Sequence, residues 1–354
     1  TCELRLAGTA RCTGLNTSGQ LGDGTQNSHD SLVEVVGLRG AVALAAGGNH
    51  TCALLLDTTV ACWGDNSQGQ LGDGTRTNRS SPVPVANLGG ISAIAAGASH
   101  TCALATIGIA PTVVCWGQNA NGQVGNGTTT DSLTPAVVTN LRGAVAITAG
   151  NTHTCAALGE SGAACWGANG TGQLGNSTNV QSTSPVLVTG LNPAVPSAPA
   201  VLGVAAGGSH TCATLADASV RCWGANSLGQ LNDGTTSLRT APVTPGGTAG
   251  TVAVGTGAGH TCAVRSTGTV TCFGANSAGQ SAAPVITATG VVVDPVGGSA
   301  TALQNVVAIA TGANHNCAVR ANGGVRCWGD SMLGQAGTGV REILTLPGTG
   351  LGRP

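Results

Sequence analysis

Cysteine and histidine are the side chains of this chain with the most distinctive chemistry, and both recur in a fixed order. A histidine stands two residues before the first cysteine of a close pair in six places, at His50, His100, His153, His210, His260 and His315. The 14 cysteines form seven such pairs, which are Cys2 with Cys12, Cys52 with Cys62, Cys102 with Cys115, Cys155 with Cys165, Cys212 with Cys222, Cys262 with Cys272, and Cys317 with Cys327. Thiols and imidazoles at this spacing can form disulfides or bind a metal ion.

The spacing within each pair favours disulfides. In six pairs the second cysteine follows ten positions after the first, so a turn near the midpoint, such as Asp57, would place the two cysteines opposite each other in a hairpin. Facing residues of antiparallel strands have Cα atoms about 4.5 to 5.5 Å apart, within reach of a disulfide. The exceptional pair, Cys102 and Cys115, encloses a longer turn at Thr106–Pro111. We therefore predict seven disulfides, one in each hairpin.

A metal site is the competing interpretation of the cysteines and histidines. Tetrahedral zinc needs four ligands, whereas each copy supplies only three. We predict no metal site and no cofactor. Persistent disulfides indicate an oxidising compartment, so we expect an extracellular or cell-surface location. No signal peptide is visible, and the chain begins at Thr1 as a processed or truncated chain would. Its apolar runs are shorter than the roughly 18 residues of a membrane span.

Catalytic residues are not indicated by these repeated side chains. A catalytic base is needed once, so six equivalent histidines favour a structural role, bonding backbone across a blade of the fold. Recurring Gly-Gln pairs favour an inter-blade backbone bond. An aromatic residue follows the second cysteine in six copies, as Phe273 in one and as tryptophan in five, at Trp63, Trp116, Trp166, Trp223 and Trp328. We expect these rings to pack between neighbouring repeats, and we predict that the protein is not an enzyme.

Charge and loop composition narrow the possible partners. Only 8% of residues are charged, the net charge is −1, and all 13 basic residues are arginine. This charge composition lacks the cluster of basic residues that a nucleic-acid-binding protein needs, so we expect a protein partner or a second copy of the chain. Asn16, Asn49, Asn126 and Asn169 begin glycosylation patterns, and glycan modification is therefore possible, with no site preferred.

The elements that would position these residues are short strands in a repeating unit. The first cysteines stand at 2, 52, 102, 155, 212, 262 and 317, which gives a period of about 50 to 57 residues, the range of propeller blades. Each repeat offers four short stretches of β-branched or small apolar residues, for example residues 50–56, 60–63, 82–85 and 91–96. We expect one all-β domain over residues 1–354, with a core of small side chains.

The repeats resemble those of the regulator of chromosome condensation family. The resemblance covers nearly the whole chain and rests on the phrases at His50–Leu54, Cys62–Asn66 and Gly69–Gly72, and on their repeated copies. It implies a seven-bladed β-propeller of four-stranded antiparallel blades. The family includes a guanine-nucleotide exchange factor, chromatin binders and secreted bacterial proteins such as a β-lactamase inhibitor, so the resemblance does not fix the function.

One strand is missing from the seven repeats. The Ala-Ala-Gly type occurs six times, at 41–46, 91–96, 144–149, 201–206, 251–255 and 306–311, and the missing copy belongs immediately before Thr1. The first blade would therefore be incomplete, and we expect the C-terminal segment Glu342–Leu346 to contribute a strand to it. Either the sequence is part of a longer chain that supplies the missing strand, or a neighbouring molecule fills the gap.

These observations favour a non-enzymatic extracellular propeller that binds other proteins or itself, most specifically a self-assembling subunit of a cell-surface or extracellular filament. A soluble secreted binder or inhibitor is one alternative. A guanine-nucleotide exchange factor is another, disfavoured because cytosolic proteins rarely keep disulfides. A propeller enzyme such as a lyase is the third, and it would require acidic or metal-binding residues to converge from non-equivalent loops.

Overall fold

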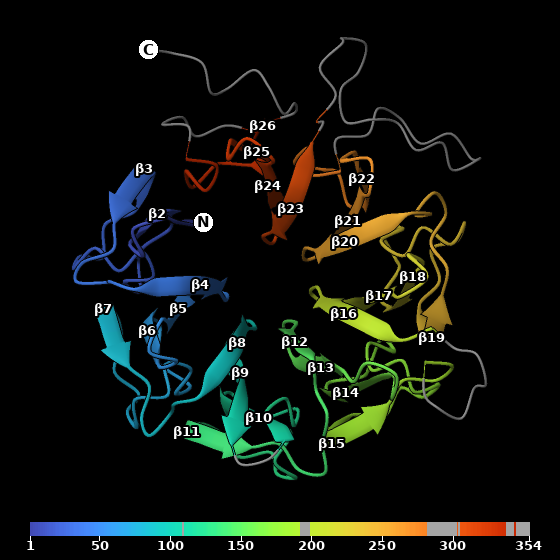
Figure 1. Ribbon diagram of the computed structural model, residues 1–354, viewed down its shortest axis with the longest axis horizontal. Coiled ribbons are helices and arrows are strands. Elements are labelled where there is room, and N and C mark those ends of the chain that lie inside the picture. The colour runs from blue at the N-terminus through green and yellow to red at the C-terminus, as the bar shows by residue number, and fades with distance from the viewer. Residues whose placement is uncertain (108–109, 192–198, 282–302, 304, 338–342, 345–354) are drawn as a thin grey trace.

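The computed structural model describes residues 1–107, 110–191, 199–281, 303, 305–337 and 343–344. In this part of the chain, seven antiparallel sheets surround a central axis as the blades of a propeller (Figure 1). Five sheets have four strands and two have three. The described residues contain no helix that could cross a membrane. The predicted seven-bladed all-β fold is confirmed.

Each blade uses its strands in the same order from the axis outward. The innermost strands are β4 (Ala41–Ala46), β8 (Ile91–Ala96), β12 (Ala146–Ala149), β16 (Val201–Ala206), β20 (Thr251–Thr256) and β23 (Val306–Thr311). The second strands, which carry the first cysteines, are β1 (Cys2–Leu4), β5 (His50–Leu55), β9 (His100–Ile107), β13 (His153–Ala157), β17 (His210–Leu215), β21 (His260–Arg265) and β24 (His315–Arg320).

The remaining strands lie farther from the axis. The third strands, which carry the second cysteines, are β2 (Ala10–Gly14), β6 (Val60–Gly64), β10 (Ala110–Gly117), β14 (Ala163–Gly167), β18 (Val220–Gly224), β22 (Val270–Gly274) and β25 (Val325–Asp330). The outer strands are β3 (His29–Glu34), β7 (Arg79–Pro84), β11 (Ser132–Val137), β15 (Ser182–Leu187), β19 (Arg239–Val243) and β26 (Ile343–Leu344). The outer strand β7 begins three residues earlier than the expected stretch at 82–85.

Hairpin register brings every predicted cysteine pair together. Cys155 lies directly opposite Cys165 in the β13–β14 ladder, and Cys102 lies opposite Cys115 despite the longer turn between them. All seven disulfides are present, with Cα–Cα distances of 4.0 to 4.1 Å. The described residues include no free cysteine. The disulfide prediction is therefore confirmed in each blade.

The first blade has three strands in the described part of the chain, β1, β2 and β3, and its innermost position is unfilled there. The C-terminal strand β26 pairs with β25 of the last blade, opposite Gly329 and Asp330. Our expectation that Glu342–Leu346 contributes to the first blade is therefore wrong for Ile343 and Leu344, because β3 already supplies the outer strand that follows the first cysteine hairpin. The other residues of that segment lie outside the described residues.

Hydrophobic clusters lie between adjacent blades. Trp116 of the third blade packs with Cys52, Leu54 and Leu71 of the second, and Trp223 of the fifth packs with Leu174 of the fourth. All five tryptophans are completely buried. The predicted packing of the aromatic residues between repeats is therefore what the structure shows, and each blade depends on its neighbour for part of its core.

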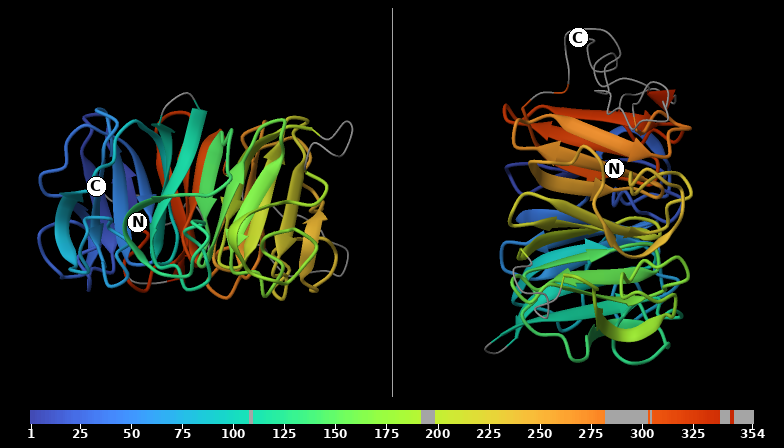
Figure 2. Two further views of the ribbon diagram at one scale, coloured as in Figure 1. Left: turned by 90° about the horizontal axis from the view of Figure 1, so that it is seen from below. Right: turned by 90° about the vertical axis from the view of Figure 1, so that its right-hand side faces the viewer.

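The strands cross the thickness of the ring, so turns and loops form its two faces (Figure 2). One face carries the turns of the cysteine hairpins, and we call it the hairpin face. There the amide of Leu56 donates to the carbonyl of Gly40, which places the start of the inner strand beside the hairpin turn. The Gly-Gln loops lie at the opposite ends of the strands, on what we call the loop face.

Cysteine accessibility predicts the order in which the disulfides can be reduced. Cys2 and Cys327 are half-buried, whereas both cysteines of the other five disulfides are buried. We expect a limiting amount of reductant to open Cys2–Cys12 and Cys317–Cys327 first, because thiol exchange requires access to a sulfur. Alkylation followed by peptide mass spectrometry measures this order, and earlier labelling of any of the other five pairs would contradict it.

Candidate functional site

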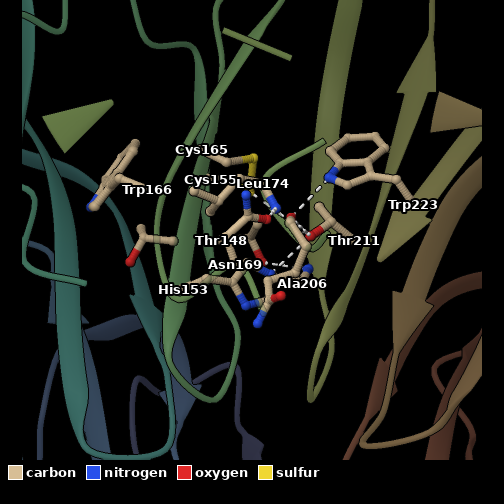
Figure 3. Close-up of a disulfide and its surroundings, with 12 residues drawn as sticks. Thr148, His153, Cys155, Cys165, Trp166, Asn169, Leu174, Ala206, Thr211 and Trp223 are labelled. Carbon is tan, nitrogen blue, oxygen red and sulfur yellow. Dashed lines mark hydrogen bonds between the residues drawn. A yellow bond between two sulfur atoms is a disulfide. The ribbon is translucent and has the colours of Figure 1, made fainter. Parts of the chain in front are cut away.

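The repeated polar residues meet at the interfaces between blades. His153 Nε2 of the fourth blade lies 2.8 Å from Thr211 Oγ1 of the fifth. Thr211 Oγ1 donates in turn to the Gln173 carbonyl of the fourth blade at 3.1 Å, and Trp223 Nε1 donates to the same oxygen at 2.9 Å (Figure 3). One carbonyl therefore accepts two bonds from the next blade, which fills its two lone pairs. We call this unit the clasp.

The clasp fixes the tautomer of its histidine. The hydroxyl of Thr211 has a single hydrogen, which it donates to Gln173, so His153 must donate from Nε2 to the hydroxyl oxygen. Nδ1 then carries a lone pair, and it is buried without a partner, as it is in His50, His100, His210 and His260. Gly150 makes this close fit possible, because a Cβ atom there would lie 2.3 Å from Cε1 of His153.

Burial holds these histidines neutral. Desolvation lowers the pKa of His50 and His153 to about 4 and the pKa of His100, His210 and His315 to about 3, and it also lowers the pKa of His260. A protonated ring would have to place an unpaired Nδ1–H in the interior. The histidines are therefore hydrogen-bond donors of the interface. Our expectation that they bond backbone is wrong, since their partners are side chains of the next blade.

The clasp recurs around the ring with substitutions. Equivalent histidine–hydroxyl contacts of 2.7 to 2.9 Å join His50 to Thr101, His100 to Thr154, His210 to Thr261, and His315 to Thr1. In the clasp of His260 the partner is Asn316 Oδ1, and Asn316 Nδ2 donates to the Gln280 carbonyl. The last and first blades also meet at Thr13, which stands where tryptophan stands in other blades. Its Oγ1 shares one hydrogen between the Gly334 carbonyl at 2.9 Å and the His29 carbonyl of its own blade at 3.0 Å.

A coupled substitution distinguishes one clasp from the others. Gly175 has a φ of +68°, and a Cβ atom there would lie 2.7 Å from Nε1 of Trp223. Gly22, Gly72 and Gly125 stand in the same relation to Trp63, Trp116 and Trp166. The equivalent residue before the sixth blade is Asn232, with a φ of 47°, and that blade has Phe273 in place of tryptophan. Asn232 thus accompanies the loss of the indole, whereas the smaller Ala282, at the same loop position in the sequence, precedes a blade that keeps Trp328.

The glutamine and asparagine side chains stabilise the loop face. Gln70 Oε1 accepts from the Gln68 amide in its own loop, while the Gln70 carbonyl accepts from Trp116 of the next blade, which is the expected inter-blade backbone bond. In the first blade the Gln20 side chain also reaches the next blade, donating to Asn49 Oδ1. Asn66 Oδ1 accepts from the Leu71 amide while Nδ2 donates to Asp73. Burial of Asp73 opposes its ionisation, but hydrogen bonds from Thr75 and Arg79 outweigh burial and hold its pKa below the ordinary value.

Other sequence candidates do not converge on a reaction centre in the described residues. No group of three or more His, Cys, Asp or Glu side chains is placed to hold a metal ion there, so the absence of a metal and of a cofactor stays a prediction. His29 lies 3.1 Å from Asp23, outside the clasps. Of the four glycosylation patterns, Asn16 and Asn169 are buried and their Nδ2 atoms bond within their loops, whereas Asn49 is exposed.

A cavity of about 690 Å³ lies at the axis and extends into the first blade. Its axial part is lined by the Gly-rich ends of the inner strands, such as Gly97 and Gly150. Its lateral part is lined by Cys2 of β1, Leu44 of β4 and Thr311 of β23. The lateral part therefore lies where an inner strand stands in the other blades, and we call it the first-blade slot.

Stability should depend on pH through the clasp histidines. The pKa values of these histidines in the folded state lie below the unfolded value of about 6.5. The stabilisation is therefore complete above pH 6.5, and it is lost as the pH falls from 6.5 through the folded values of about 4 and 3. Each histidine should contribute a slope of about 1.4 kcal/mol per pH unit within that window. Urea unfolding followed by tryptophan fluorescence measures the slope of the unfolding free energy against pH. The substitution His153→Gln removes one titrating group and should reduce this slope by about 1.4 kcal/mol per pH unit.

A double-mutant cycle tests the coupling of Asn232 and Phe273. Phe273→Trp alone should lower the free energy of unfolding by about 1 to 3 kcal/mol, because the indole meets the Asn232 side chain. Combined with Asn232→Gly, the same change should be tolerated, since the indole can then donate to the Gln230 carbonyl. Strictly additive effects of the two substitutions would contradict the coupling.

Comparison with known proteins agrees with this geometry. A family model described as the regulator of chromosome condensation (RCC1) repeat matches residues 59–104, 112–157 and 165–214, and a second model with that description matches 41–70, 91–123, 201–230, 252–280 and 306–335. None of the curated proteins matches the chain.

Solved structures share the fold at low identity. Human WBSCR16 is 20% identical with a TM-score of 0.82, over 96% of this chain and 94% of that chain. Yeast RCC1 (Prp20), solved with Kap60, is 21% identical with a TM-score of 0.78, over 95% and 82%. Prp20p from Saccharomyces cerevisiae, described with its binding to Gsp1p and histones, is 22% identical with a TM-score of 0.79, over 97% and 86%. The chain belongs to the regulator of chromosome condensation (RCC1) repeat family.

Proposed function

We propose that this propeller is a non-enzymatic, extracellular protein-interaction module whose partner is a second copy of the same chain. More specifically, it would be a self-assembling subunit of an extracellular or cell-surface filament. The observation that carries this proposal is the first-blade slot, where β1 has a paired edge toward β2 and no strand on its other edge among the described residues. Open sheet edges bind strands of other chains readily.

Three properties of the chain support this proposal. The distinctive polar side chains of the repeats are used within the clasps and loops, which favours binding over catalysis. Seven disulfides are consistent with an oxidising environment, which favours an extracellular location. A net charge of −1 gives little electrostatic repulsion between copies and no basic surface for nucleic acid. Strand insertion from copy to copy would be heterologous and would propagate unless the rotation closed a ring.

A soluble binder of another protein is the second candidate, and the hairpin face favours it. Val42, Val145, Leu202, Val252 and Val307 occupy equivalent places near the starts of the inner strands, and all are exposed. Contiguous apolar residues on a surface often mark a binding site. The exchange-factor alternative is less favoured because of the disulfides, and a lyase would need a cluster of acidic or metal-binding residues.

Self-association of the disulfide-intact chain tests the proposal. Sedimentation velocity over a series of micromolar concentrations should show a sedimentation coefficient that rises with concentration, and negative-stain electron microscopy should show stacked or end-to-end rings. Stable monomers at every concentration would reject self-assembly and would leave the soluble binder as the better proposal.

A further inference from the structure

We infer that copies of this chain stack on a common axis, with the hairpin face of one ring against the loop face of the next. This inference rests on the proposed self-association and names two surfaces that can meet without any exchange of strands. Three features carry it. Aliphatic side chains surround the axis on the hairpin face, small residues surround it on the loop face, and the two faces have opposite excesses of charge.

The aliphatic side chains on the hairpin face stand at β-bulges of the inner strands. The register of the β4–β5 ladder shifts around Val42, which has no paired residue in the described part of β5. The same shift surrounds the second residue of three further inner strands, which are Leu202, Val252 and Val307. A bulge turns its extra side chain away from the regular pleat. These four side chains are 47% to 60% exposed, so they face solvent around the axis.

The bulge of β8 shows that the fold does not require an aliphatic residue at this position. Ser92 occupies that bulge and is exposed, and its hydroxyl donates to the Leu104 carbonyl at 3.3 Å. Aliphatic residues nevertheless stand at the other four bulges, and the exposed Val145 has the equivalent place before β12. We call these five residues the aliphatic ring. Contiguous apolar side chains that their own fold leaves exposed indicate a surface that a partner covers.

The opposite ends of the same strands carry small residues on the loop face. Because the inner strands run from the hairpin face to the loop face, both of their ends lie near the axis (Figures 1 and 2). The turns that follow them include Gly47-Gly48, Ala258 and Ala313, which line the axial cavity, and both alanines are exposed. In a coaxial stack the aliphatic ring of one copy would meet these turns of the next, where no large side chain holds the two surfaces apart.

Charge is divided unequally between the two faces. Among the described residues, the half of the ring nearer the hairpin face has eight arginines and five carboxylates, whereas the half nearer the loop face has three arginines and seven aspartates. The small net charge of the whole chain therefore combines a positive hairpin face with a negative loop face. Surfaces of opposite sign attract each other and disfavour contacts between like faces.

Both excesses are concentrated where the last and first blades meet. The hairpin side of this sector has two glutamates and five arginines, which are Arg5, Arg11, Arg39, Arg320 and Arg326. The loop side of the same sector has three aspartates and, among the described residues, no arginine; the aspartates are Asp23, Asp30 and Asp330. A stack with little rotation between copies would therefore place the negative sector of one copy against the positive sector of the next.

Two other arrangements fit these surfaces less well. Contact between two hairpin faces would cover both aliphatic rings, but it would bring two positive surfaces together. An anionic membrane would attract the arginines, yet the hairpin turns that would reach it first carry exposed carboxylates at Asp57, Glu160 and Asp217. Head-to-tail stacking avoids both conflicts. It is heterologous, so each added copy leaves a free face and the stack can grow into a filament.

Separate blocking of the two faces tests the inference. A hairpin-blocked variant, Leu202→Glu with Val252→Glu, places carboxylates in the aliphatic ring, opposite the acidic loop face. A loop-blocked variant, Ala258→Arg with Ala313→Arg, places long cationic side chains on the small-residue turns. All four residues are exposed, so each variant should keep the thermal unfolding midpoint of the parent chain within about 3 °C.

Each blocked variant alone should associate at least tenfold more weakly than the parent chain in sedimentation velocity. An equimolar mixture should form a dimer and nothing larger, because the intact loop face of the hairpin-blocked variant can bind the intact hairpin face of the loop-blocked variant only once. Dimers of the loop-blocked variant alone would show contact between two hairpin faces and would overturn head-to-tail stacking.

A matched pair of single variants tests the aliphatic ring itself. Ser92→Val adds an aliphatic side chain to the ring and should strengthen association at least twofold. Leu32 is an exposed aliphatic residue within the outer strand β3, away from the axis, and Leu32→Ser should change association less than twofold. If Ser92→Val leaves association unchanged, the ring is not part of the contact and the inference fails.

Failure of stacking can be told apart from failure of self-association. If both blocked variants associate as strongly as the parent chain, copies meet elsewhere, as through the first-blade slot, and only stacking is rejected. If the parent chain is monomeric at every concentration, both proposals are rejected. Binding of that monomer to vesicles of equal parts phosphatidylcholine and phosphatidylserine, lost in the hairpin-blocked variant, would then assign the aliphatic ring to a membrane surface.

Discussion

The structure depends on the glutamine carbonyl of the Gly-Gln pair, which accepts two hydrogen bonds from the next blade at five described interfaces: those of Gln20, Gln70, Gln123, Gln173 and Gln280. The Gln123 oxygen receives Thr154 Oγ1 and Trp166 Nε1, and Thr154 lies opposite Trp166 in the hairpin that Cys155–Cys165 closes. The disulfide thus holds the two donors side by side. Since this arrangement links a loop of one blade to a hairpin of the next, the order of Thr-Cys, Cys-Trp and Gly-Gln within the repeat is set by the interface and not by any single blade.

The repeat made the fold and the covalent structure predictable. Cysteine spacing identified all seven disulfides, including the longer Cys102–Cys115 hairpin, because facing positions in a hairpin are fixed by local geometry. The six inner strands were also recognisable, since two small residues and a glycine end each stretch of alternating small and aliphatic residues. Only the strand expected at 144–149 is shorter, beginning at Ala146. These features are determined over distances of a few residues, which a single sequence displays directly.

Contacts between blades were less predictable because they join residues about 30 to 60 positions apart. The repeat pattern indicated a structural role for His153 but did not identify Thr211 as its partner. A threonine that recurs beside a cysteine can be explained equally well by contacts within its own hairpin. Strand counting also assigned β26 to the wrong blade, because the number of strands does not determine which sheet each strand joins. The Asn232–Phe273 pair was missed, although a signal was present: the repeat departs from Gly and from Trp in adjacent copies.

The clasps leave few polar side chains of the ring interior free to bind a partner. Recognition by side chains requires groups with unused hydrogen-bonding capacity, yet the histidine Nε2, threonine, glutamine carbonyl and indole of each complete clasp already satisfy one another in the interior. The inner strands contribute mainly alanine, glycine and aliphatic residues around the axis. At Cys2, by contrast, backbone donors and acceptors lie next to the cavity, at an edge of β1 that has no partner strand among the described residues. A partner that supplies the complementary edge would satisfy those groups without disturbing any clasp, because the last and first blades are already joined by His315–Thr1 and Thr13–Gly334.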